Sequence, residues 1–113
     1  MKVSFEGVGE QVLSFEKASD TAKNVFVKVS ANNTVAACSA GDNFAGYCIG
    51  TDDSFAVVKT HGYIEVGYTG TAPAVGYAKL AADAGGKVKK SDTGREFLVI
   101  KVDSTAATVG FIM

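Results

Sequence analysis

The chain has 113 residues, which is enough for one domain that buries a core without disulfides or a metal. Apolar residues make up 47% of it and charged residues 20%, a globular composition that argues against disorder. The net charge of −1 gives no bulk attraction to nucleic acid or to an anionic membrane, so neither is expected as a partner.

The charge is unevenly divided along the chain. Residues 1–57 hold four basic and seven acidic side chains, a net charge of −3, whereas residues 58–113 hold seven basic and five acidic ones, a net charge of +2. If the two halves lie on different faces, copies of the chain can pack head to tail. Chance scatter of weakly interacting surface charges is the alternative.

The first ten residues differ in pattern from the rest. Val3 and Phe5 are apolar, but glycines interrupt any regular element. Residues 1–10 are therefore predicted to be either an edge strand or an arm that becomes ordered against a neighbour. Residues 11–113 are predicted to form a single β domain.

Short runs of β-branched and aromatic residues follow one another along the rest of the chain, with turn residues between them. About nine or ten strands, with turns every 8–12 residues, indicate an all-β fold, a compact antiparallel barrel or sandwich. The predicted strands are Gln11–Phe15, Val25–Val29, Thr34–Cys38, Gly46–Gly50, Phe55–Thr60, Tyr63–Tyr68, Tyr77–Ala81, Lys87–Lys90, Glu96–Val102 and Ala106–Met113.

Some pairings can also be predicted. Asparagine turns favour a hairpin of Val25–Val29 with Thr34–Cys38, and Phe55–Thr60 is expected to pair with Gly46–Gly50. Phe55–Thr60, Tyr63–Tyr68 and the strand that starts at Tyr77 are expected to form one antiparallel unit. A bend at His61-Gly62 and a wide turn at Thr69–Gly76 would connect its strands.

Three further predictions concern a short helix, a central strand and two similar hairpins. Alanines make Ala78–Ala84 the best candidate for a short helix, which Gly85-Gly86 would end. Glu96–Val102 is apolar on both faces in its middle, which is typical of a central strand. Cys48–Val58 and Leu98–Phe111 look alike as hairpins, although the chain has no repeat of fixed period.

Few residues suggest site chemistry. Cys38 and Cys48 can be buried apolar residues, a disulfide, or a metal or redox pair, but two cysteines and a distant histidine do not make a zinc set. His61 can be a bend residue, an interface contact or a catalytic base, and the last role needs a nucleophile and an orienting group beside it. No catalytic, metal or cofactor-binding residue is predicted.

Aromatic residues gather in the middle of the chain. Tyrosine is enriched in protein interfaces, although half-buried positions in a sheet would explain the cluster equally. The predicted partner-binding residues are Val3, Phe5, Tyr63, Tyr68 and Tyr77.

From Val25 to the C-terminus, the segments NTVAACSAGDNFAGY, GYIEV, GTAPAVGYAKL, EFLVIKVD and ATVGFIM follow one another with turns between them. In this layout the chain resembles the small decoration proteins of phage heads; residues 1–24 lie outside the resemblance. It implies a β-barrel-like domain that binds the outside of the lattice of the major capsid protein, as a homotrimer. It also implies a place on the virion surface after synthesis in the host cytoplasm, without enzyme activity or cofactor.

Two other functions remain open from the residues. The Tyr63–Tyr77 region could make the chain a recognition module for carbohydrate or a cell-surface ligand. A small hydrolase built on His61 is the third hypothesis.

Overall fold

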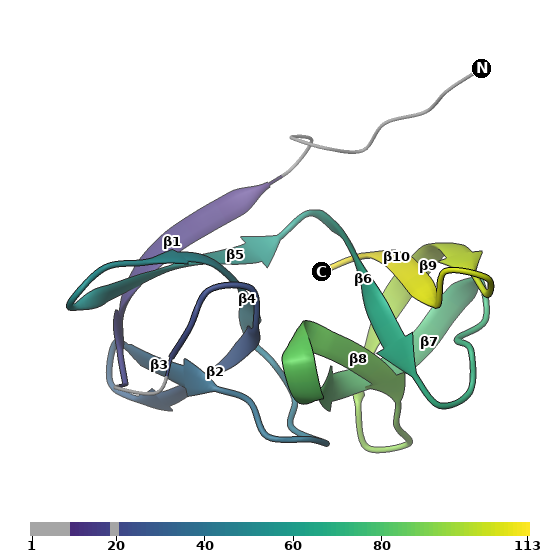
Figure 1. Ribbon diagram of the computed structural model, residues 1–113, viewed down its shortest axis with the longest axis horizontal. Helices are drawn as coiled ribbons and strands as arrows, with labels where there is room; N and C mark the ends of the chain where they lie inside the picture. Colours follow the sequence, from purple (N-terminus) through teal and green to yellow (C-terminus); the bar gives the residue numbers. More distant parts are fainter. Residues whose placement is uncertain (1–9, 19–20) are drawn as a thin grey trace.

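The computed structural model describes residues 10–18 and 21–113, and this part of the chain is mostly β-strand (Figure 1). It contains ten strands and a three-residue 3-10 turn, so the predicted all-β class with at most one short helix is confirmed. The elements are β1 (Gln11–Lys17), β2 (Phe26–Ala31), β3 (Thr34–Ala37), β4 (Gly46–Thr51), β5 (Phe55–His61), β6 (Tyr63–Thr69), β7 (Gly76–Asp83), the 3-10 turn η1 (Ala84–Gly86), β8 (Lys87–Lys90), β9 (Arg95–Asp103) and β10 (Thr108–Ile112).

The ten strands form two closed barrels that lie side by side (Figure 1). Barrel 1 contains the first five strands in the order β1-β3-β2-β4-β5, and barrel 2 contains the last five in the order β10-β6-β8-β7-β9. Each sheet closes because its first and last strands in sequence also pair with each other.

The two barrels have the same topology. The first and third strands of each barrel are parallel, as β1 with β3 and β6 with β8, and every other pair is antiparallel. If β1 is matched with β6, β2 with β7, and so on to β5 with β10, every pairing in barrel 1 has its counterpart in barrel 2. The chain is thus a tandem structural repeat of one five-stranded barrel.

Local details repeat as well. The pairing of β4 with β5 passes over Ile49, and the pairing of β9 with β10 passes over Ile100 at the matching place. At the turn that follows, Asp52 Oδ1 accepts two backbone N–H bonds of 2.9 and 2.7 Å, and Asp103 Oδ1 accepts two of 3.0 and 3.1 Å. These bulges and carboxylate-capped turns make the hairpins noted in the sequence structurally equivalent.

The repeat has no fixed period because matching segments of the two barrels differ in length. The registers match Cys48 of β4 with Val99 of β9, a separation of 51, but Val58 of β5 with Phe111 of β10, a separation of 53. The longer turn between β9 and β10 accounts for the difference.

The predicted antiparallel unit of Phe55–Thr60, Tyr63–Tyr68 and the following strand is wrong. β5 pairs within barrel 1, whereas β6 pairs with β8 and β10 in barrel 2. His61-Gly62 is the link between the barrels, and Gly62 has φ of +116°, which an L side chain rarely adopts. Strands adjacent in sequence are separated here because each half of the chain closes its own sheet.

The predicted strand Tyr77–Ala81 is confirmed as part of β7, and the candidate helix over Ala78–Ala84 does not form, because these residues lie in β7 and at the start of η1. Leu80 and the two alanines after it are fully buried in the barrel wall, so tertiary packing overrides the weak helix preference of alanine. The segment predicted as a central strand is β9. A closed sheet has no edge strands, so the distinction between an edge strand and a central strand does not apply to it. Its residues Phe97 and Val99 are buried, while Leu98 between them is 37% exposed.

An aromatic cluster joins the two barrels. Phe44, in the connection between β3 and β4, lies with its ring parallel to that of Phe97 of barrel 2, 5.1 Å between ring centroids. Its centroid also lies 4.2 Å from that of Phe26 and 6.3 Å from that of Phe111. The core of barrel 2 therefore includes two phenylalanines of barrel 1.

The same connection, residues 38–45, is hydrogen-bonded to barrel 2 along its length. The N–H of Gly41 donates to the carbonyl of Ala82 at 2.9 Å, and the N–H of Ala82 donates to the carbonyl of Asp42 at 2.9 Å. Asn43 donates to the carbonyl of Thr93 and accepts from the N–H of Arg95, at 3.3 and 3.2 Å. These bonds fix the orientation of one barrel on the other.

Candidate partner-binding surfaces

Four side chains form a continuous row across the outside of barrel 2. Tyr77 lies opposite Leu98, Leu98 lies opposite Ile112, and Ile112 lies opposite Tyr63, so the row crosses β7, β9, β10 and β6. Side chains directly opposite one another on neighbouring strands touch. Tyr77 is 72% exposed and Leu98 and Ile112 are each 37% exposed. We call this set the outer row of barrel 2.

Glycine and a polar contact hold one end of this row in place. Tyr63 lies across Gly110, where a β-carbon would collide with its hydroxyl. The same hydroxyl donates to Glu65 Oε2 at 3.2 Å. The aromatic ring thus covers the glycine of the neighbouring strand, as aromatic residues do elsewhere in sheets.

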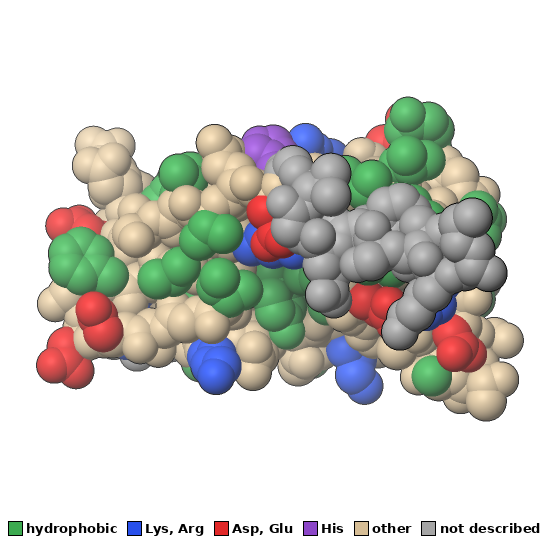
Figure 2. Space-filling model, turned by 90° about the horizontal axis from the view of Figure 1, so that it is seen from above, with side chains coloured by type: hydrophobic (Ala, Val, Ile, Leu, Met, Phe, Trp, Pro, Cys, Tyr) green, Lys and Arg blue, Asp and Glu red, His purple; other side chains and the backbone are tan. Residues whose placement is uncertain are grey.

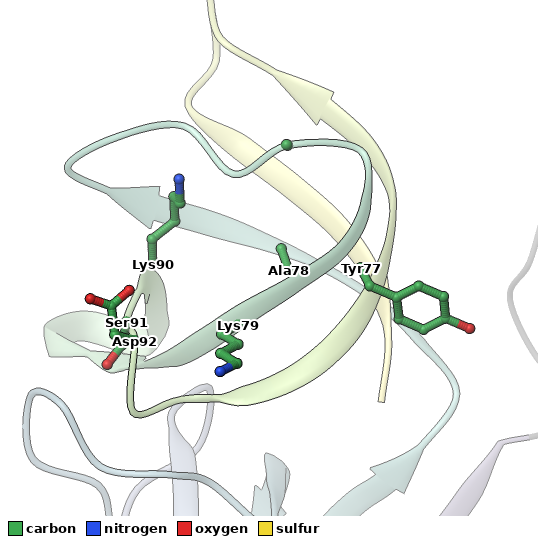
Figure 3. A pocket seen from close by; sticks show the side chains of 7 residues that line it. Tyr77, Ala78, Lys79, Lys90, Ser91 and Asp92 are labelled. Atoms are coloured by element: carbon green, nitrogen blue, oxygen red, sulfur yellow. The ribbon is translucent and has the colours of Figure 1, made fainter.

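A shallow hollow of about 390 Å³ lies beside the start of β7. Its polar lining comes from Lys79, Lys90, Ser91 and Asp92 (Figure 3). Tyr77 also lines the hollow, but its ring projects away from these polar groups (Figure 3).

A second apolar surface lies on barrel 1, along the paired strands β1 and β5. Val12 and Phe55 are exposed by 44% and 49% on the outward-facing side of these strands, and we call them the ribbon face. Leu13, which is 42% exposed, lies opposite the buried Val58 and on the other side of the sheet. Figure 2 shows hydrophobic side chains gathered on this side of barrel 1. Large apolar groups exposed together are typical of interaction surfaces.

The predicted partner residues do not all lie on one surface of the structure. Tyr63 and Tyr77 lie together in the outer row, whereas Tyr68 packs against the core of barrel 2. Val3 and Phe5 lie outside the described residues. Sequence reasoning missed Leu98 and Ile112. Leu98 stands between Phe97 and Val99, which are buried, so the two-residue period of a strand places its side chain on the outer face.

The two cysteines are free thiols. Burial raises the pKa of Cys38 to about 11, and the neighbouring carboxylate of Asp42 adds to the rise. Burial likewise raises the pKa of Cys48, which is fully buried in the core of barrel 1. Both are held as unreactive thiols at neutral pH, because the thiolate is the reactive form.

His61 is exposed at the end of β5, where the chain passes from one barrel to the other. Within residues 10–18 and 21–113, no three histidine, cysteine or acidic side chains gather to form a metal site. In the same part of the chain, no helix has the length and apolar character needed to cross a bilayer.

Fold and surfaces together define a tandem double β-barrel with two exposed apolar surfaces, one on each barrel. The chain matches no family model, and no curated protein or solved structure shows significant similarity to it.

Proposed function

We propose that the chain is a structural virion protein that decorates the outside of a capsid lattice, with the ribbon face of barrel 1 as its contact with the major capsid protein. The observation that carries this proposal is the exposure of Val12 and Phe55 on the outward-facing side of β1 and β5, on a closed double barrel. The layout of the sequence from Val25 onward, which is similar to that of head decoration proteins, supplies the kind of partner. The role needs no catalysis and no cofactor.

The fold supports a role as a rigid platform. Each sheet closes on itself, which removes the long open edges through which β proteins add strands or aggregate. Binding then depends on side-chain faces. Because a capsid presents the same site many times, a modest apolar contact repeated over linked copies gives strong attachment.

The test is co-sedimentation of the purified chain with undecorated capsids of the phage that encodes it. Phe55→Asp and Val12→Asp place a charge in the ribbon face and should abolish sedimentation with the capsid. The matched control is Ala106→Asp, an exposed residue of the β9–β10 turn whose N–H donates to Asp103 as that of Phe55 donates to Asp52, and it should bind as the parent chain does. Capsid binding unchanged by both ribbon variants would refute the assignment of this face, and no binding by the parent chain would refute the function.

The recognition-module hypothesis predicts binding on a glycan array that Tyr77→Ala abolishes. No specific contact in the structure favours it, since the Tyr77 ring and the polar lining of the hollow face different ways.

A further inference from the structure

The interface between the two barrels uses two different surfaces. Barrel 1 contributes its own outer row, Phe26, Tyr47 and Lys59, which the strand registers match with Tyr77, Leu98 and Ile112 of barrel 2. Barrel 2 contributes the region around Ala82 and Gly86, which we call its head. The registers match this head with Val29 and Asn33 of barrel 1.

Contacts within the chain show how the two surfaces meet. Phe26 is only 2% exposed in the shared aromatic cluster, and Tyr47 packs against the same cluster. Lys59 Nζ donates to the carbonyl of Tyr63 at 2.5 Å. The outer row of barrel 1 is therefore covered by barrel 2.

The head of barrel 2 is covered in return. Ala82 is fully buried and exchanges both of its backbone hydrogen bonds with the connection of barrel 1. Gly86 lies so close to the carbonyl of Asn24 that a β-carbon there would collide with it. Gly86 and its counterpart Asn33 both have positive φ, +73° and +58°, although the turn is the three-residue η1 in barrel 2 and a two-residue turn between β2 and β3 in barrel 1.

Each surface of this interface is left open once, at the barrel that has no neighbour within the chain. The outer row of barrel 2 is exposed, with Tyr77 at 72%, whereas its counterpart Phe26 is at 2%. The head of barrel 1 is exposed, with Val29 at 58%, whereas its counterpart Ala82 is at 0%. One chain thus carries an uncovered outer row on barrel 2 and an uncovered head on barrel 1.

We propose that copies of this chain associate head to tail, the outer row of barrel 2 in one copy covering the head of barrel 1 in the next. The arrangement repeats between chains the contact that already exists inside each chain. The charges are compatible with it, because residues 1–61, through the end of barrel 1, have a net charge of −2 and residues 62–113 have a net charge of +1. An interface that joins two different surfaces gives a ring when the rotation between copies closes, and an open chain when it does not.

The contact between copies is smaller than the one inside the chain. Residues 91–94 between β8 and β9 replace the longer connection of residues 38–45, and the register places Arg95 where barrel 1 has Phe44. The ring of Phe44 therefore has no aromatic counterpart in the contact between copies, and only Tyr77 stands where barrel 1 has the ring of Phe26. Association should depend on concentration rather than being permanent.

The experiment measures mass in solution by light scattering and sedimentation, with the purified chain alone. The parent chain should rise above its monomer mass of 11.6 kDa as concentration increases. Tyr77→Asp, which disables the outer row, and Val29→Asp, which disables the head, should each remain monomeric. Phe55→Asp, an equally drastic change at an exposed apolar residue outside both surfaces, should associate like the parent chain.

Mixing the two disabled variants is the decisive step. Tyr77→Asp retains the head and Val29→Asp retains the outer row, so an equimolar mixture should form pairs of twice the monomer mass. A parent chain that stays monomeric at every concentration overturns the proposal. So does a mixture that forms no pairs while the parent chain associates, because the outer row and the head would then not be the two surfaces that meet. Val29→Asp that still associates by itself also overturns it, because outer rows would then be binding one another.

A fold control accompanies each variant. Circular dichroism and thermal unfolding should match the parent chain, and Leu98→Lys with Val29→Lys provides a second pair if an aspartate variant unfolds. The proposal does not depend on capsid binding. The experiment contains no capsid, so a failure of self-association is distinguishable from a failure of decoration.

Discussion

Phe44 is the residue through which the two barrels should depend on each other for stability. Its side chain is 5% exposed and lies against three other rings, two of them in barrel 2. Replacing it with alanine removes the ring from the shared core and leaves a cavity that the hydrogen-bonded connection around it cannot easily close. The variant Phe44→Ala tests whether this cluster joins the two barrels energetically.

The expected loss follows from burial. An aromatic side chain buries about 150–250 Å², and at about 25 cal/mol per Å² this corresponds to roughly 4–6 kcal/mol. Alanine retains part of that contact, so the loss falls within the range of about 3–5 kcal/mol typical of phenylalanine-to-alanine changes in cores. A chain of this length has a total stability of about 6–17 kcal/mol. Phe44→Ala should therefore remove a large fraction of the free energy of unfolding.

Urea unfolding followed by circular dichroism measures the change, since the chain has no tryptophan to serve as a fluorescent probe. The control is Phe55→Ala, the same chemical change at a side chain that is 49% exposed, for which we expect a loss below about 1 kcal/mol. The reasoning is refuted if Phe44→Ala costs no more than the control, because the ring cluster would then contribute nothing to joining the barrels.

Three further predictions concern local features. In β4, Gly46→Ala should destabilise by about 1–3 kcal/mol by overpacking, because its β-carbon would lie 2.5 Å from the carbonyl oxygen of a neighbouring strand, whereas Gly50→Ala meets nothing within 4 Å and should be nearly neutral in the same urea assay. The hydrogen bond from Lys28 lowers the pKa of Asp42. The stabilisation that the ionised Asp42 gives the folded chain is therefore present above the unfolded pKa of about 3.9 and is lost as pH falls through the lower folded value. Asp42→Asn should make the free energy of unfolding less dependent on pH in this range. The buried thiol of Cys48, whose pKa is raised, should react with a thiol reagent at pH 8 only as fast as the barrel opens, and rapid labelling of the native chain would contradict this.

Local structure was largely predictable from the sequence, because alternation reports directly on a strand. Val25–Val29 with Thr34–Cys38 and Gly46–Gly50 with Phe55–Thr60 pair as expected, since short turns leave each strand no other partner nearby. The same alternation fails at Ala78–Ala84, where alanine fits a helix and a crowded barrel wall equally well.

The division into two barrels could not be predicted in this way. Periodicity tells which side of a strand is buried but not which distant strand it pairs with, and β6 pairs with β10 across the whole second half of the chain. The repeat is hidden because matching core positions hold different residues. Gly46 in barrel 1 corresponds to Phe97 in barrel 2, since one barrel is filled by small side chains and the other by rings from both.

The members of the partner surface could also be predicted only in part from the sequence. Tyr63 and Tyr77 were identified by residue type, but Leu98 and Ile112 join them only through the registers of two distant strands. Tyr68 has the same chemistry and a similar place in the sequence, yet it faces the core. Composition can therefore suggest that a partner surface exists, whereas the barrel closure decides its members.

Divergence between the two barrels makes the contact inside the chain different from the proposed contact between copies. Identical barrels would make the two contacts alike, and they would then compete. Here the connection of residues 38–45 and its Phe44 give the internal contact an aromatic anchor and four hydrogen bonds that the short turn of residues 91–94 cannot supply. The contact inside the chain is therefore the stronger one, and the weaker copy of this arrangement remains for the proposed association between copies. The ribbon face belongs neither to the outer row of barrel 2 nor to the head of barrel 1, so the proposed capsid contact and the proposed association use separate surfaces.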